Sequence, residues 1–219
     1  MKAAHTAQIA LAVCLLLATN ANAQEAAAKN GPDELPILLQ LKGDPVRGKT
    51  VFAACGDCHR KDGGGRTNGV FPRLAGQHGP VLIKQLSDIR SGRRNNPSMQ
   101  PLASELSQSD IADVAAYVQS LPISPTNGKG PGTGVTRGKQ LYDRDCASCH
   151  GGNGEGEAAK FYPMVAAQHY RYLVREVVSI RDGDRRNSDP QMVQVVKDYS
   201  QSDIEAVADF IAQLPPPKR

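Results

Sequence analysis

The chain has 219 residues, a formal charge of +4, five cysteines and no tryptophan, and only 5% of its residues are aromatic. This length allows one or two domains, and the ordinary share of apolar residues excludes a wholly disordered chain. Basic and acidic residues nearly balance, at 26 and 22, without long Lys or Arg blocks, so nucleic-acid binding is not favoured. No apolar run is long enough to cross a bilayer, which disfavours an integral membrane protein.

The N-terminus has the three parts of a secretory signal peptide. Lys2 provides the positive start, residues 9–18 form a short apolar run, and Ala21-Asn22-Ala23 is a small-residue cleavage site. We therefore predict that residues 1–23 are a signal peptide; the alternative is a buried N-terminal helix. Removal would discard Cys14 and leave four cysteines in an oxidising compartment.

The rest of the chain is a tandem repeat. The sequence Cys55-Gly56-Asp57-Cys58-His59 recurs 91 residues later as Cys146-Ala147-Ser148-Cys149-His150. Two more pairs recur at the same offset: Phe71-Pro72 as Tyr162-Pro163, and Gln77-His78 as Gln168-His169. Repeats at a fixed period indicate duplicated structural units. The sequence therefore predicts domains at residues 44–122 and 136–219, a Pro- and Gly-containing linker at 123–135, and an N-terminal arm at 24–43.

Helix signals occur at matching places in the two repeats. Asp44 and Pro45 favour the start of a helix that runs into Cys55, and Thr136 is the candidate cap of its counterpart, which runs into Cys146. An amphipathic helix is expected at Leu82, Leu86 and Ile89, and again at Leu173, Val177 and Ile180. The last helices open at Ser-x-x-Asp capping boxes and stop at prolines, from Ser107 to Pro122 and from Ser200 to Pro215. No alternating strand pattern appears, so an all-α fold is predicted.

The C-x-x-C-H motif is the signature of covalent c-type haem attachment. Two thiols separated by two residues can each add to a vinyl group of one haem, and the adjacent His then lies beneath the iron as its ligand. We therefore predict two haem c groups, held by Cys55, Cys58 and His59 in the first repeat and by Cys146, Cys149 and His150 in the second.

Other uses of these cysteines fit less well. One zinc site would need the two motifs to meet, although each lies in its own repeat. A thioredoxin-like dithiol expects alternating strands and helices, which the sequence lacks. The remaining alternative treats the four cysteines as structural disulfides.

Two sets of residues compete for the sixth coordination position. Met99 and Met192 occupy matching places, each after an Arg- and Asn-rich loop and just before the final helix. His78 and His169 also match across the repeat. As ligands they would give bis-His haems of lower potential; the alternative is that they are ordinary residues at a helix start. Methionine is favoured, because an axial Met is the usual way to raise the potential of a cytochrome c.

The order of these features resembles the class I cytochrome c fold, and two such units behind a signal peptide resemble the dihaem cytochrome c4 family. The resemblance covers Asp44 to Pro215. It implies two tandem class I cytochrome c domains, each wrapped around one covalently bound haem c, in the periplasm. It also implies that Pro72 and Pro163 each supply a carbonyl that hydrogen-bonds the proximal His. Because Arg73-Leu74-Ala75-Gly76 becomes Met164-Val165-Ala166-Ala167 in the second repeat, we expect two different reduction potentials.

The resemblance further implies an electron carrier of a respiratory chain, not an enzyme. Its partners would be redox proteins such as a membrane oxidase, a reductase complex or a dehydrogenase. One alternative is the dedicated electron-transfer subunit of a periplasmic dehydrogenase, for example a flavin-linked one. A second is a dihaem enzyme, either a peroxidase or a thiosulfate-oxidising cytochrome. An open iron site or a spare cysteine would be needed for that chemistry, and matched methionines and the loss of Cys14 argue against both.

Six arginines form a repeated basic cluster: Arg90, Arg93 and Arg94, with Arg181, Arg185 and Arg186. They could dock redox partners, pair with haem propionates, or form a solvated charged face.

Overall fold

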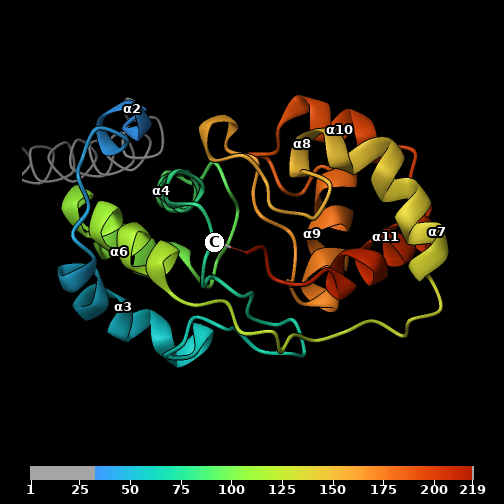
Figure 1. The fold of residues 1–219 in the computed structure, drawn as a ribbon. Helices are drawn as coiled ribbons and strands as arrows, with labels where there is room; N and C mark the ends of the chain where they lie inside the picture. The colour runs from blue at the N-terminus through green and yellow to red at the C-terminus, as the bar shows by residue number, and fades with distance from the viewer. Residues whose placement is uncertain (1–32, 219) are drawn as a thin grey trace, which may run out of the picture. The chain divides into compact units, whose positions relative to one another are not determined.

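The computed structural model describes residues 33–218, whose fold is shown in Figure 1. The predicted signal peptide and the first part of the predicted arm lie outside the described residues. Within residues 33–218 the regular structure is helical, apart from an isolated bridge between Glu157 and Tyr162. The predicted all-α class is confirmed. No helix in this part of the chain is long and apolar enough to cross a membrane.

The three helices predicted for the first repeat are present. They are α3 (Pro45–His59), the amphipathic helix α4 (Gly79–Arg90) and the final helix α6 (Gln108–Ser120). Two short helices were not predicted: α5 (Gln100–Glu105) lies between α4 and α6, and α2 (Leu35–Leu38) lies in the predicted arm.

The second repeat has the same order of elements, shown from yellow to red in Figure 1. Its first helix is α7 (Val135–Leu141), which continues through a π-helical turn η1 (Tyr142–Cys146) into α8 (Ala147–His150). A 3-10 turn η2 (Ala158–Lys160) follows in the loop after the cysteine motif. The remaining helices are α9 (Tyr170–Arg181), α10 (Pro190–Val196) and α11 (Gln201–Gln213).

Most of the predicted helix starts are confirmed by their capping bonds. The Asp44 carboxylate accepts hydrogen bonds from the backbone N–H groups of Val46 and Arg47 at the start of α3. Ser107 caps α6 in a complete capping box, and Ser200 caps α11 through the backbone N–H of Asp203. The short side chains at these positions therefore fix where each helix begins.

The predicted cap of the second repeat's first helix is wrong. Helix α7 already begins at Val135, so Thr136 lies inside its first turn, and Gly134 is the residue before the helix. The backbone N–H of Gly134 donates to Oδ2 of Asp209 at 3.1 Å. A side chain from α11 therefore holds the entry to this helix, which a local sequence pattern does not reveal.

Each repeat has its own apolar core. The core of the first repeat includes Leu38, Phe52, Leu82, Ile111 and Val114. The core of the second includes Leu141, Tyr142, Leu173, Ile204 and Val207. Leu38 is fully buried, so the last part of the predicted arm packs onto the first repeat and contributes to its stability.

The first and last helices of each repeat cross closely at a glycine. A Cβ atom at Gly48 of α3 would lie 2.0 Å from the carbonyl oxygen of Asp113 in α6. A Cβ atom at Gly138 of α7 would lie 1.9 Å from the carbonyl oxygen of Ala206 in α11. Both distances are far shorter than van der Waals contact, so only glycine permits these crossings.

The segment between the repeats has no helix but is held in place. The buried Asn127 side chain donates from Nδ2 to the carbonyl oxygens of Gln168, at 2.7 Å, and Ala212, at 2.9 Å. The carbonyl of Gly128 accepts from the backbone N–H of Tyr170 at 2.8 Å. The predicted linker therefore packs against the second repeat instead of acting as a free tether.

Candidate haem sites and the contact between the repeats

The first cysteine motif forms the end of α3. His59, its last residue, has 4% of its surface exposed, and its Nδ1 lies 2.9 Å from the carbonyl oxygen of Pro72. A carbonyl oxygen can only accept, so Nδ1–H is the donor and Nε2 keeps its lone pair. Burial lowers the pKa of His59 and favours the neutral ring. A neutral imidazole with a free Nε2 is the form that ligates iron.

The second cysteine motif has the same geometry. His150, at the end of α8, places Nδ1 2.9 Å from the carbonyl oxygen of Pro163. Burial lowers the pKa of His150 as well. The π-helical turn that ends at Cys146 has no counterpart in α3, yet the histidine makes the same bond in both repeats. In both repeats a carbonyl after the glycine-rich loop therefore fixes the orientation of the motif histidine.

The thiols fit covalent attachment better than a metal-thiolate site. Cys55, Cys58, Cys146 and Cys149 form no disulfides. Burial raises the pKa of the Cys55 thiol, and it raises that of Cys146 to about 12. Zinc and redox sites need thiolates, which these surroundings disfavour. Within residues 33–218 no group of three His, Cys, Asp or Glu side chains is placed to hold a metal ion.

The two candidate methionine ligands lie at equivalent bends of the chain. Met99 directly precedes α5, and its backbone N–H donates to the carbonyl oxygen of Asn96 at 3.1 Å. Met192 lies in the first turn of α10, which Asp189 caps. Both are half-buried, and each lies at the start of a short unpredicted helix, directly before α5 for Met99 and within α10 for Met192. Their role as axial ligands stays a prediction.

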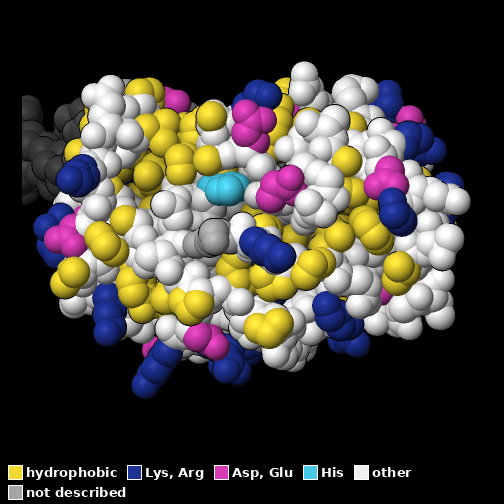
Figure 2. Space-filling view, viewed as in Figure 1, with side chains coloured by type: hydrophobic (Ala, Val, Ile, Leu, Met, Phe, Trp, Pro, Cys, Tyr) yellow, Lys and Arg dark blue, Asp and Glu magenta, His cyan; other side chains and the backbone are white. Residues whose placement is uncertain are grey.

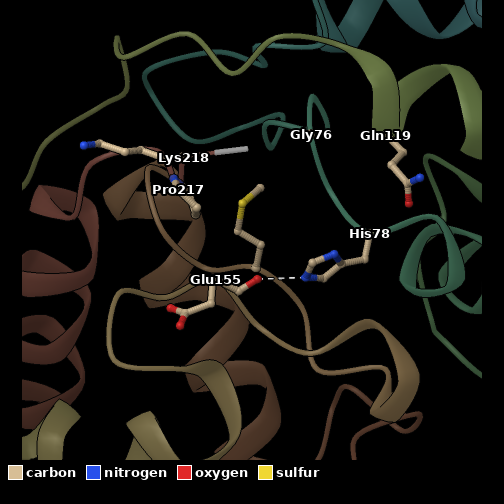
Figure 3. Close-up of a pocket in the computed structure, with 7 residues that line it drawn as sticks. Gly76, His78, Gln119, Glu155, Pro217 and Lys218 are labelled. Carbon is tan, nitrogen blue, oxygen red and sulfur yellow. Dashed lines mark hydrogen bonds between the residues drawn. The ribbon is translucent and has the colours of Figure 1, made fainter.

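His78 and His169, the competing candidate ligands, form hydrogen bonds between the repeats. The Nδ1 atom of His169 accepts from the backbone N–H of Gly128 at 3.0 Å, and its Nε2–H donates to the carbonyl oxygen of Gly64 at 2.9 Å. Both ring nitrogens are thus occupied. In the other repeat, Nε2 of His78 donates to the carbonyl oxygen of Glu155 at 2.7 Å, the dashed line in Figure 3. Each histidine therefore reaches the glycine-rich loop of the other repeat.

The glutamine before each histidine makes the same reciprocal contact. Gln77 donates from Nε2 to the carbonyl oxygen of Met164 at 3.0 Å, and its Oε1 accepts from the backbone N–H of Met164 at 2.9 Å. Gln168 forms the same pair of bonds with the backbone of Arg73, at 3.0 and 2.9 Å. Since Arg73 and Met164 are equivalent positions, the two repeats meet in a nearly symmetric way. Sequence reasoning missed this use of the repeated Gln-His pair, although its recurrence was the signal.

Two of the six clustered arginines, Arg94 and Arg185, also join the repeats. Nη2 of Arg94 lies 2.9 Å and Nη1 of Arg185 lies 2.8 Å from the same carboxylate oxygen of Glu176. Arg185 also donates to Oε1 of Gln85 in α4 at 3.2 Å. Arg94, Arg185 and Glu176 are less than one fifth exposed, so this triad is not a solvated face. On the face in Figure 2, basic side chains are scattered among hydrophobic ones instead of forming one continuous patch.

A cavity of about 390 Å³ lies beside the His78–Glu155 bond (Figure 3). Its lining includes Gln119 of the first repeat and Met164, Pro217 and Lys218 of the second. The cavity therefore belongs to the contact between the repeats.

Comparison with known proteins places the chain in a family. The cytochrome c family model matches residues 45–122 and again residues 135–215. Cytochrome c4 of Pseudomonas aeruginosa is 34% identical over 185 residues, which cover 81% of this chain and 92% of that protein. The chain belongs to the cytochrome c4 family. As in the other members, its two cytochrome c domains carry two covalently bound haem c groups, and the protein is an electron carrier.

Two further relatives agree with this cytochrome c4 assignment. The crystal structure of reduced recombinant cytochrome c4 from Pseudomonas stutzeri matches with a TM-score of 0.72 and 32% identity, and covers 78% of this chain and 99% of that one. A protein named thiosulfate dehydrogenase electron acceptor, from Stutzerimonas stutzeri, is 31% identical over 198 residues, with 81% of this chain and 91% of that protein covered. The predicted family, fold and cofactors are thereby confirmed.

Proposed function

We propose that this protein is a periplasmic electron carrier in which His59 and Met99 ligate one iron and His150 and Met192 ligate the other. Bound haem c supplies a one-electron Fe(III)/Fe(II) couple. Two protein ligands on each iron would leave no position for a substrate, so we also propose that the protein is not an enzyme. The single observation that carries this proposal is the matched Nδ1–carbonyl bond of the two buried motif histidines.

The chain's own residues do three things in this function. The cysteines anchor the cofactor, which therefore cannot dissociate outside the cytoplasm. The carbonyls of Pro72 and Pro163 orient the histidines and make them better electron donors to iron. Fixed ligands keep the geometry nearly the same in both oxidation states, so little reorganisation accompanies electron transfer.

The methionine assignment is supported by elimination at the competing positions. His169 uses both ring nitrogens, and His78 uses its Nε2, in bonds to backbone groups. Ligation by either residue would break a hydrogen bond to the other repeat, at a cost of about 1–3 kcal/mol for each group left unpaired. The described hydrogen bonds of Met99 are made by its backbone N–H and carbonyl, which leaves its sulfur available as a ligand.

A redox titration of the holoprotein with optical detection tests the proposed function. We expect two reversible one-electron steps with low-spin spectra in both oxidation states. A high-spin haem in the oxidised protein, or turnover of hydrogen peroxide well above that of free haem, would show an open iron site and support the enzyme alternative. Fractionation of cells that express the full chain tests location, with a mature N-terminus at Gln24 expected in the periplasmic fraction.

A second candidate is a dedicated electron acceptor of a periplasmic dehydrogenase. The Stutzerimonas stutzeri relative named thiosulfate dehydrogenase electron acceptor favours it. Stopped-flow mixing of the oxidised holoprotein with thiosulfate and purified thiosulfate dehydrogenase separates the two roles. A reduction rate that saturates at submicromolar dehydrogenase, together with a one-to-one complex of the two proteins, would indicate a dedicated partner. Slow reduction that increases linearly with enzyme concentration would indicate a general carrier.

A further inference from the structure

Arg73 is a buried cation without a hydrogen-bonding partner for its side chain. Its side-chain atoms Nε, Nη1 and Nη2 are all buried and make no hydrogen bond, and the residue is 4% exposed. Both its backbone N–H and its backbone carbonyl are hydrogen-bonded to the side chain of Gln168 in the second repeat. The contact between the repeats therefore holds the Arg73 residue where its side chain is buried away from solvent.

The described part of the chain offers no counter-charge for this guanidinium. Desolvation alone accounts for the lowering of its pKa, to about 10. The charged or titratable groups that it affects are basic, namely Lys129 and His169, whose pKa values it helps to lower. An unpaired buried charge costs several kcal/mol. A buried unpartnered charge in a native structure therefore calls for a compensating group, and for a cation an anion is the most effective one.

The site lies next to a haem attachment point. Arg73 directly follows Pro72, whose carbonyl oxygen is 2.9 Å from Nδ1 of His59. Each haem c brings two propionate carboxylates, the only anions that the cofactors add to the protein. A guanidinium is well suited to a carboxylate, because two of its N–H groups can donate in parallel. The equivalent residue in the second repeat is Met164, which has no charge.

We propose that Arg73 binds a haem propionate at the contact between the two repeats and raises the reduction potential of that haem. A fixed positive charge disfavours Fe(III) relative to Fe(II), and the effect is large where water is excluded. Because Met164 cannot do the same, this contact makes the two haems electrostatically unequal. The inference uses the haem attachment and holds whichever residues are the sixth ligands.

Substitution of Arg73 by Met, the residue of the second repeat, tests the proposal. We expect the R73M holoprotein to keep two haems and to show at least a tenfold loss in the equilibrium constant for reduction of one haem. For a one-electron couple this is a fall of about 59 mV. R73K, which keeps the charge, should recover most of the potential. If R73M fails to retain haem, R73Q, which is neutral but can still donate hydrogen bonds, carries the same expectation.

Arg60 provides the matched control. It directly follows His59, but its side chain is 61% exposed and pairs with Asp62. R60M removes the same charge in solvent, where screening is strong, and should leave both potentials nearly unchanged. Unchanged potentials in both R73M and R73Q would overturn the proposal, as would equal shifts in R73M and R60M. Loss of the sulfur–iron signature in unaltered protein would instead refute the proposed methionine ligands and leave this inference intact.

Discussion

Nε2 of His169 lies 2.9 Å from the carbonyl oxygen of Gly64, in the loop that follows the haem motif of the other repeat. His78 makes the equivalent bond to Glu155 in the opposite direction, at 2.7 Å. Gly64 and Glu155 occupy equivalent positions. In each repeat a histidine therefore donates the same hydrogen bond to the loop after the cysteine motif of the other repeat. The two repeats should therefore stabilise one another when haem is bound.

Replacement of His169 by Phe should destabilise the holoprotein by about 2–4 kcal/mol. The ring is 1% exposed, and its loss removes the partner of two partly buried backbone groups, the N–H of Gly128 and the carbonyl of Gly64. Urea denaturation followed by circular dichroism measures the change in unfolding free energy. His78→Phe is the matched control and should cost less, because His78 is only partly buried. Equal and negligible losses in both variants would show that these bonds do not couple the repeats.

Gly48→Val should prevent normal packing of the first repeat. Even the Cβ atom would lie 2.0 Å from the carbonyl oxygen of Asp113, so α3 and α6 must separate. We expect a loss of stability above about 3 kcal/mol, together with lower haem content. Gly152→Val is the control, because nothing lies within 4 Å of the Cβ position there. Pyridine haemochrome analysis counts the haem, and a fully loaded, stable G48V protein would contradict the close helix crossing.

Glu176→Ala should cost about 3–5 kcal/mol, since it leaves two largely buried arginines, Arg94 and Arg185, without their shared carboxylate. Glu157→Ala removes a similar carboxylate, but Glu157 pairs with Lys160 in an exposed salt bridge worth less than about 1 kcal/mol. Urea midpoints of the two variants, measured at the same salt concentration, give the comparison. Similar small losses would mean that solvent reaches the Glu176 site.

Protonation of Asp88 should lower the unfolding free energy of the protein in acid. Burial opposes its ionisation, but hydrogen bonds from Asn187, Lys84 and Arg93 outweigh burial and hold the pKa of Asp88 below its usual value. The folded state therefore binds fewer protons, so this stabilisation is present above the unfolded pKa of about 3.9 and is lost as the pH falls through the folded pKa. In urea titrations, Asp88→Asn should be less stable than the unaltered protein at pH 7. The difference in unfolding free energy between the two proteins should become smaller below about pH 4. A difference that does not change with pH would rule out this role of Asp88.

Local signals predicted much of this fold because they act within a few residues. The Asp44 cap, the Ser107 capping box and the apolar stripe of α4 depend only on neighbouring side chains and helical spacing. The cysteine motif predicted haem for the same reason. The start of α7 was missed because a distant residue, Asp209, holds Gly134.

The contact between the repeats could not be read from the sequence. The recurrence of the Gln-His pair is visible in the sequence, but it does not distinguish a haem ligand from a residue with another role. Its partners are backbone carbonyls and N–H groups, which carry no sequence signature. Similarly, the sequence left three uses open for Arg94 and Arg185, and it does not show that Glu176 lies between them. The burial of the Arg73 side chain depends on the contact between the repeats, which the sequence does not show.

The central claim is that each iron has one histidine and one methionine ligand. Near-infrared magnetic circular dichroism of the oxidised holoprotein tests it most directly, because ligation by methionine gives a sulfur-to-iron band. We predict that this band accounts for both haems, and that Met99→Ala and Met192→Ala each remove half of it. A band for neither haem, or full intensity retained in either variant, would contradict the assignment.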